Sequence, residues 1–132
     1  MNKTILLIDD EHTILEITTL VLEDAGYQVI AFLSATEAIA YYKQHQHEIH
    51  ATILDMTMPE MDGITCAKAL WNINTQATII LSSGYTYEDI TQEHQDVKFH
   101  AFLQKPYLPH TLLDQLASMF SPNTVEETLD SA

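Results

Sequence analysis

The sequence predicts an α/β fold, a doubly wound, five-stranded parallel sheet with strand order 2-1-3-4-5. Five short apolar runs carry this prediction, because each is nearly continuous, as in parallel strands that are covered on both faces. Between the runs, apolar residues recur with the spacing of a helix face. Strand and helix therefore alternate along the chain, and right-handed crossovers place helices on both sides of the sheet.

The expected elements follow one another in a regular order. Strands are expected at 4–8, 29–32, 51–54, 77–81 and 101–103. Helix faces are expected from Ile14, Ile17 and Val21, from Ala35, Ala38, Ile39 and Tyr42, from Ile64, Ala67 and Trp71, and from Leu112, Leu113, Leu116 and Phe120. Between 87 and 95, Ile90 is almost the only large apolar residue, so a helix there would be loosely anchored and mobile.

Capping residues and a glycine mark the ends of the first two helices. The first helix should begin after Asp10 and end at Gly26, which is free to adopt the left-handed conformation. Ser34 is the expected cap of the second helix, with Glu37 placed to complete a capping box. The polar, histidine-rich stretch 44–50 is expected to be a loop.

Length, charge and hydropathy limit what the chain does. Its 132 residues fit one domain, placed at 1–120 and followed by an acidic tail or the start of a linker at 121–132. The net charge of -14 would repel nucleic-acid phosphates, so direct nucleic-acid binding is not expected. No apolar run approaches the ~20 residues of a membrane span. We expect a soluble, cytoplasmic protein without membrane insertion, and the single Cys66 agrees with a reducing compartment.

Polar side chains lie where the predicted strands end. Asp9 and Asp10 follow the first strand, Asp55 the third, Ser83 the fourth and Lys105 the fifth. These ends share one edge of a parallel sheet, and strands one and three would be neighbours at the topological switch point, so the residues should converge. Three carboxylates in one pocket repel each other by roughly 4 kcal/mol per pair at ~4 Å and an effective dielectric of ~20. Oxygen ligands without His or Cys favour Mg²⁺ as the compensating cation.

The same group of residues is suited to phosphoryl transfer. A carboxylate that faces a cation, a lysine and a hydroxyl is equipped to attack phosphorus and form an aspartyl phosphate. Asp55 is the expected nucleophile because it lies deepest, immediately before the 56–63 loop. Asp9 and Asp10 form a pair better suited to holding the metal.

Four motifs resemble the receiver domains of response regulators in two-component signalling. They are Ile-Asp-Asp-Glu at 8–11, Leu-Asp-Met-Thr-Met-Pro-Glu-Met-Asp-Gly at 54–63, Leu-Ser-Ser-Gly-Tyr at 81–85 and Phe-Leu-Gln-Lys-Pro-Tyr at 102–107. The last two resemble particularly the receivers attached to hybrid histidine kinases. The resemblance covers about residues 3–120 and implies a flavodoxin-like receiver fold.

The resemblance implies a role for each residue that matches a family motif. It makes Asp55 the phosphoacceptor, Asp9 and Asp10 the acidic pair that holds Mg²⁺ together with Asp55 and the Met56 backbone carbonyl, Ser83 the switch hydroxyl and Lys105 the phosphate-binding lysine. It also makes Phe102 the mobile aromatic, makes Thr57 and Tyr85 modulators of self-dephosphorylation, and places a cis peptide before Pro106.

The expected function is that of a phosphoacceptor. Asp55 would take a phosphoryl group from a histidine kinase or a histidine phosphotransfer protein, after which the domain changes conformation. It would catalyse only its own Mg²⁺-dependent phosphorylation and dephosphorylation. A homodimer formed on phosphorylation is a further expectation.

Two other functions use similar residues. Phosphatases of the haloacid dehalogenase type also combine an aspartate nucleophile, magnesium, a hydroxyl and a lysine, but their nucleophile lies in an Asp-x-Asp arrangement on strand one. Asp9 is instead followed by Asp10 and Glu11, and the chain lacks room for a cap domain. The second alternative is an interaction module that is never phosphorylated, against which the presence of all five expected side chains argues.

Several residues also have simpler structural interpretations. Asp10 and Glu11 would cap the first helix, Asp55 would be an ordinary strand-end aspartate, Ser83 a small residue in a tight turn, and Lys105 and Pro106 the start of a helix. His45, His47 and His50 form either a metal site or, as is more common, a solvated loop. Cys66 and Trp71 are most simply core residues.

Overall fold

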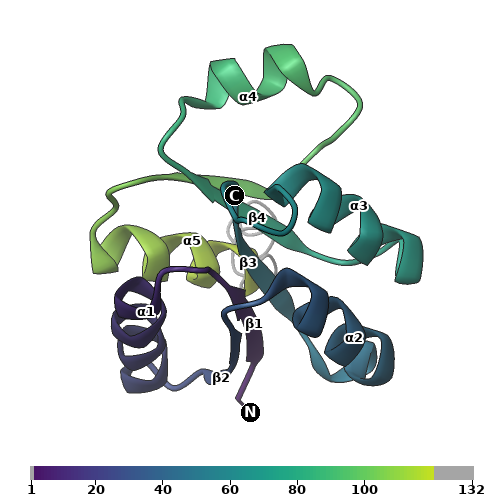
Figure 1. Ribbon diagram of the computed structural model, residues 1–132. Helices are drawn as coiled ribbons and strands as arrows, with labels where there is room; N and C mark the ends of the chain where they lie inside the picture. Colours follow the sequence, from purple (N-terminus) through teal and green to yellow (C-terminus); the bar gives the residue numbers. More distant parts are fainter. Residues whose placement is uncertain (1, 121–132) are drawn as a thin grey trace, which may run out of the picture.

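A five-stranded parallel sheet between two layers of helices makes up the computed structural model, which describes residues 2–120 (Figure 1). The strands are β1 (Thr4–Ile8), β2 (Gln28–Phe32), β3 (Ala51–Asp55), β4 (Ile79–Ser83) and β5 (Ala101–Gln104). The helices are α1 (His12–Asp24), α2 (Ala35–His45), α3 (Gly63–Ile73), α4 (Tyr87–Glu93) and α5 (Pro109–Phe120), with a short 3₁₀ turn, η1 (Gln46–Glu48), after α2. The tail expected at 121–132 lies outside the described residues.

The order of the strands is the one that the sequence predicts. The sheet runs β2-β1-β3-β4-β5, and every neighbouring pair is parallel. All residues of β3 and β4 are buried, whereas the edge strands β2 and β5 are partly exposed. Central strands with helices on both faces have no polar side, which explains why their sequences are continuous apolar runs.

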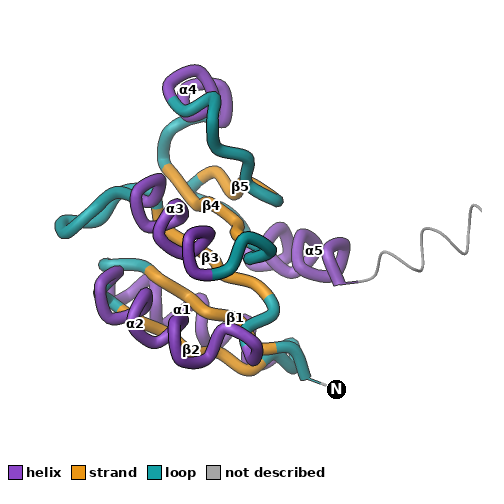
Figure 2. The backbone as a smooth tube through the Cα atoms, turned by 90° about the vertical axis from the view of Figure 1, so that its right-hand side faces the viewer, coloured by secondary structure: helices purple, strands orange, loops and turns teal. Residues whose placement is uncertain are grey.

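Two apolar cores lie on opposite faces of the sheet, because successive side chains of a strand point to opposite sides. One core joins alternate residues of β1, β3 and β4 to α2 and α3: Leu6, Ile8, Leu54, Leu81, Ala38 and Leu70. The other joins the intervening residues to α1 and α5: Ile5, Leu7, Ile53, Ile80, Leu22, Leu112 and Leu116. Figure 1 shows the sheet between these layers, with α2 and α3 on one side and α1 and α5 on the other, and Figure 2 views the molecule from the side of α2 and α3.

The buried face of α1 is not the one expected from its apolar spacing. Thr18 and Leu22 are its buried residues, whereas the Ile17 side chain is 53% exposed. The helix carries apolar residues on two faces, with Leu15 and Leu22 toward the core, so that spacing alone does not show which face packs on the sheet. An apolar surface of α1 therefore remains uncovered.

Some boundaries also differ from the expected ones. The supposed loop 44–50 is partly helical, because α2 continues to His45 and η1 follows. His45 stabilises the last turn of α2 by packing on Tyr41, with ring centroids 4.0 Å apart. β4 begins at Ile79, two residues later than expected, since the Ala77 N–H bonds to the Asn74 carbonyl in the turn after α3.

Other local expectations are confirmed. Gly26 has a φ of 101°, the left-handed conformation expected after the first helix. The Ser34 hydroxyl caps α2 by accepting the Glu37 N–H at 3.2 Å. As its composition indicates, α4 buries only Ile90; its expected mobility stays a prediction.

No helix among residues 2–120 is both long and apolar enough to span a membrane.

Candidate functional site

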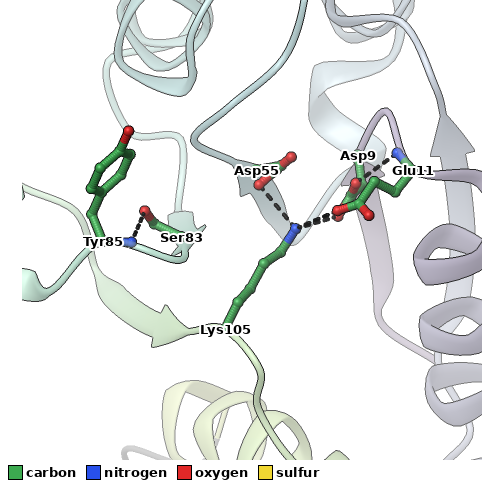
Figure 3. A network of polar contacts seen from close by, with 6 residues as sticks. All are labelled: Asp9, Glu11, Asp55, Ser83, Tyr85 and Lys105. Atoms are coloured by element: carbon green, nitrogen blue, oxygen red, sulfur yellow. Dashed lines mark hydrogen bonds and ion pairs between the residues drawn. The ribbon is translucent and has the colours of Figure 1, made fainter.

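Three aspartates and a lysine meet at the carboxyl edge of the sheet. Figure 3 shows two of the aspartates, Asp9 and Asp55, with Lys105 between them. Ile8 and Leu54 are register partners, so Asp9 and Asp55, each one residue further along, emerge side by side. One carboxylate oxygen from each of Asp9, Asp10 and Asp55 lies within 4.8 Å of the others. The convergence expected from strand topology is thus confirmed for the acidic residues.

Lys105, the first residue after β5, extends its side chain into this cluster. Its Nζ lies 3.0 Å from Asp55 Oδ1 and 3.1 Å from Asp9 Oδ2. The Lys105 N–H donates to the Ser83 carbonyl at 2.7 Å, which ties the start of the side chain to the end of β4. The simpler interpretation, in which Lys105 only begins a helix, is wrong because α5 starts at Pro109.

Glu11 is a site neighbour that the sequence interpretation assigned only to helix capping. Its Oε1 lies 3.7 Å from Lys105 Nζ, and the Glu11 N–H donates to Asp9 Oδ1 at 2.9 Å. Glu11 stands at the N-cap position of α1 but makes no side-chain cap bond. Its place directly after the acidic pair was the one available signal of this contact.

The site carries more negative than positive charge. Asp9 and Asp55 are buried, and the one ammonium group of Lys105 lies beside the carboxylates of three aspartates and of Glu11. Burial and the charge of Asp9 raise the pKa of Asp55 to about 6, despite the opposing effect of Lys105. Burial alone would lower the pKa of Lys105, but its hydrogen bond to Asp55 and the charges of Asp9 and Asp55 raise it above the ordinary value. Such a site favours a further cation.

Ser83 lies on the same edge of the sheet but does not join the cluster of charges. Its buried hydroxyl accepts the Tyr85 N–H at 2.9 Å (Figure 3). Tyr85 itself is 57% exposed. Among the described residues, the Ser83 hydroxyl makes no hydrogen bond to the side chain of Asp55 or Lys105, so it is held by its own loop in this conformation.

The loop after Asp55 holds the other two expected residues. The Met56 carbonyl accepts the Gly63 N–H at 2.7 Å, which leaves it one lone pair. Thr57 is exposed. Within the part of the chain that the structure describes, the Thr57 carbonyl accepts no backbone N–H.

Phe102 belongs to β5, and its ring faces α4 rather than the charged cluster. Its half-buried ring packs edge-on against Tyr87, with centroids 5.6 Å apart. Both rings line a hollow of about 380 Å³, which Ile90 and Val97 also border. The Lys105–Pro106 peptide bond is cis, as the resemblance implies.

The remaining candidates have structural roles. His50 Nδ1 accepts the Thr4 N–H at 3.0 Å and His45 Nδ1 lies 3.0 Å from the Tyr41 carbonyl, and the one three-residue group suited to a metal in the described range is the aspartate cluster. Cys66 is fully buried in the core. Trp71 packs on the same core and donates its ring N–H to the Ala77 carbonyl.

Comparison with known proteins decides the family. The model of the response regulator receiver domain family matches residues 5–117. The chain belongs to this family. It is therefore a receiver domain of two-component signalling, as its motifs predicted.

Related proteins include both free-standing and attached receivers. The chemotaxis protein CheY of Bacillus subtilis is 29% identical, with 88% of this chain and 96% of CheY covered. The sensor kinase CckA of Brucella abortus is 32% identical over 98% of this chain, which spans only 13% of CckA. The CheX–CheY–BeF₃–Mg²⁺ complex of Borrelia burgdorferi contains a similar chain, with a TM-score of 0.82, 28% identity and 89% of each chain covered.

Proposed function

We propose that Asp55 is the phosphoacceptor of this receiver and takes its phosphoryl group from a histidine kinase or a histidine phosphotransfer protein. The observation that carries the proposal is the position of the Asp55 carboxylate, buried at the end of β3 with Lys105 Nζ at 3.0 Å and Asp9 beside it. Asp9 and Asp10 lie in the same cluster, but Asp55 alone directly precedes the long loop between β3 and α3, as expected for a nucleophile beside that loop.

The transfer exchanges one bond to phosphorus for another. An Asp55 oxygen attacks phosphorus, the bond from phosphorus to the donor's histidine nitrogen breaks, and the histidine keeps the electron pair. Lys105 then exchanges its contact with Asp55 Oδ1 for one with a phosphoryl oxygen. The Ser83 hydroxyl gives up the Tyr85 N–H to donate to another of these oxygens, which couples phosphorylation to the β4–α4 loop.

The residues present fit a magnesium ion. Asp9, Asp10 and Asp55 offer only oxygen ligands, and their excess negative charge requires a cation. When bound, Mg²⁺ would supply positive charge that neutralises the phosphoryl oxygens. The loop after Asp55 would add a carbonyl oxygen, through the free lone pair of Met56 or through Thr57, whose carbonyl accepts no backbone N–H in the described chain.

A protein donor must approach this site past exposed apolar side chains. Ile17 of α1 is 53% exposed and lines a hollow together with Lys105, and Leu108, three residues after Lys105, is 60% exposed. We infer that the donor packs on this surface. Ile17→Asp should slow transfer from any phosphohistidine protein that phosphorylates the wild type, and should leave the reaction with acetyl phosphate unchanged. The same charge placed on α5, in Ser118→Asp, should affect neither reaction.

Intact-mass measurement with acetyl phosphate and MgCl₂ tests the phosphoacceptor. The wild type should gain one phosphoryl group, and Asp55→Asn should gain none while keeping its fold, because an amide does not attack phosphorus. Full phosphorylation of Asp55→Asn would overturn the assignment. Turnover of many phosphomonoesters would instead favour a phosphatase, and an absence of any reaction would favour an interaction module.

The conformational response should centre on Phe102. Movement of Ser83 toward the phosphoryl group would vacate space into which this ring turns, and without a hydroxyl its inward state would depend on packing alone. Beryllofluoride with Mg²⁺, present in the related Borrelia complex, should therefore shift amide resonances of β4, β5 and α4. Unchanged resonances would contradict this switch.

Size-exclusion chromatography of the same samples checks the expected homodimer.

A further inference from the structure

Glu60 links the loop after Asp55 to the first turn of α2. Its Oε1 accepts the Ala35 N–H at 2.6 Å, and its Oε2 accepts the Ser34 hydroxyl at 2.9 Å. The contact joins residues 25 and 26 positions apart in the chain. A carboxylate from a different segment thus occupies the N-terminus of α2.

The contact is favourable for both partners. The first backbone N–H groups of a helix have no acceptor within the helix, and its N-terminus carries partial positive charge. Ser34 already accepts the Glu37 N–H, so its hydroxyl proton is free to go to Glu60. The bond from Ser34 and further bonds from Ala35 and Thr36 lower the pKa of Glu60. Glu60 is therefore ionised and held at neutral pH.

The same loop is held at two other points. The Met58 side chain is 7% exposed and lies in the core, and the Gly63 N–H donates to the Met56 carbonyl. Glu60 supplies the side-chain hydrogen bonds from this loop to α2. With all three points in place, the backbone of Met56 and Thr57 has little freedom to move relative to Asp55.

We propose that Glu60 is a positioning residue for the phosphorylation site, which fixes the loop that adds a carbonyl oxygen to Mg²⁺. The inference rests on the proposed function and extends it to a residue that touches neither metal nor phosphate. Groups that orient metal ligands typically contribute about 10–100-fold to metal affinity. Removal of Glu60 would disturb only one carbonyl among several Mg²⁺ ligands. We therefore expect Mg²⁺ affinity to fall by about tenfold, near the lower end of this range.

The test compares Glu60→Ala with Glu37→Ala. Glu37 lies in the first turn of the same helix and is exposed, so its removal takes the same charge from the same helix end without touching the loop. Titration with MgCl₂ by isothermal calorimetry should give a dissociation constant about tenfold higher for Glu60→Ala and an unchanged one for Glu37→Ala. Phosphorylation by acetyl phosphate should be slow in Glu60→Ala at low MgCl₂ and recover as MgCl₂ saturates.

Two further variants separate positioning by the Glu60 contact from an effect of charge alone. Glu60→Gln keeps an oxygen acceptor and should recover part of the lost affinity, whereas a purely electrostatic effect would leave it as weak as Glu60→Ala. Ser34→Ala combined with Glu60→Ala should lose less Mg²⁺ affinity than the sum of the single losses, because both changes remove one shared contact.

Equal Mg²⁺ dissociation constants for wild type, Glu60→Ala and Glu37→Ala would overturn the inference. That result differs from failure of the proposed function, which would appear as a wild type that binds Mg²⁺ but is not phosphorylated. A common loss of affinity in Glu60→Ala and Glu37→Ala would also refute positioning, since it would show that only charge at the helix end matters.

Discussion

Gly63 is the position at which a single methyl group should disturb both stability and phosphorylation. An ideal Cβ there would lie 2.8 Å from the Asp55 carbonyl oxygen, 2.8 Å from Met56 Cα and 2.9 Å from Leu81 Cδ1. Two of these three atoms belong to the backbone at the end of β3. Gly63→Ala therefore forces α3 away from the backbone of Asp55, the proposed phosphoacceptor.

The cost follows from the closeness of these contacts. Extra methyl groups in a packed interior cost about 1–3 kcal/mol, and the upper half of this range, about 2–3 kcal/mol, applies when backbone must move. With an unfolding entropy of about 2.1 cal/mol/K per residue, this loss lowers Tm by roughly 7–12 °C. The displaced Asp55 should also react more slowly with acetyl phosphate.

The other two glycines are matched controls for this experiment. An added Cβ at Gly84 meets nothing within 4 Å, so Gly84→Ala should leave the free energy of unfolding unchanged or raise it by up to about 1 kcal/mol. Gly26→Ala should cost about 1–2 kcal/mol through its positive φ alone. Because Gly26 lies between α1 and β2, that variant should react at the wild-type rate.

Urea unfolding of the three variants, followed by phosphorylation rates for Gly63→Ala and Gly26→Ala, completes the test. If Gly63→Ala is as stable as Gly84→Ala, the close approach of α3 to β3 is not a constraint. If Gly63→Ala is destabilised but phosphorylated at the wild-type rate, Gly63 has no influence on Asp55.

Three further predictions concern the metal, the lifetime of the phosphoryl group and the cysteine. MgCl₂ should raise the Tm of the wild type and do so much less in Asp10→Asn, and equal shifts would remove Asp10 from the site. Once the donor is removed, phosphorylated Tyr85→Ala should decay faster than the wild type, because the exposed ring shields phosphorus from water, and unchanged or slower decay would exclude shielding. Burial and the charge of Glu60 raise the pKa of Cys66 from 9.0 to about 12, so at pH 8 its reactive thiolate is about 1000-fold rarer. Native protein should therefore resist iodoacetamide and react after unfolding in guanidinium, whereas equal rates in both states would refute burial of the thiol.

The central residues of the site were predictable because they depend on topology. Asp9 and Asp55 directly follow apolar runs, and parallel strands bring such ends to one edge of the sheet. Lys105 and Ser83 are placed on this edge by the same rule, but the rule gives no side-chain contacts. Lys105 joins the aspartates, whereas the Ser83 hydroxyl bonds within its own loop.

Residues outside the strand ends were assigned less well. The apolar spacing of α1 placed Ile17 toward the core, yet it is 53% exposed, because a helix with two apolar faces has two ways to pack. The stretch 44–50 was expected to be a loop, but packing of His45 on Tyr41 accompanies the continuation of α2. Neither the exposure of Ile17 nor the packing of His45 on Tyr41 follows from the composition of these segments.

The order of apolar runs and the residues that end them determined the fold class, the strand order and the acidic cluster, because strand pairing and side-chain alternation follow general rules. Only the tertiary structure decided the contacts of Glu60 with Ser34 and Ala35 and of Glu11 with Lys105. The Glu60 and Glu11 side chains are exposed, and an exposed side chain can adopt many conformations that are equally compatible with the sequence pattern. Their partners are chosen by how the loops and helix ends approach one another after the sheet has formed.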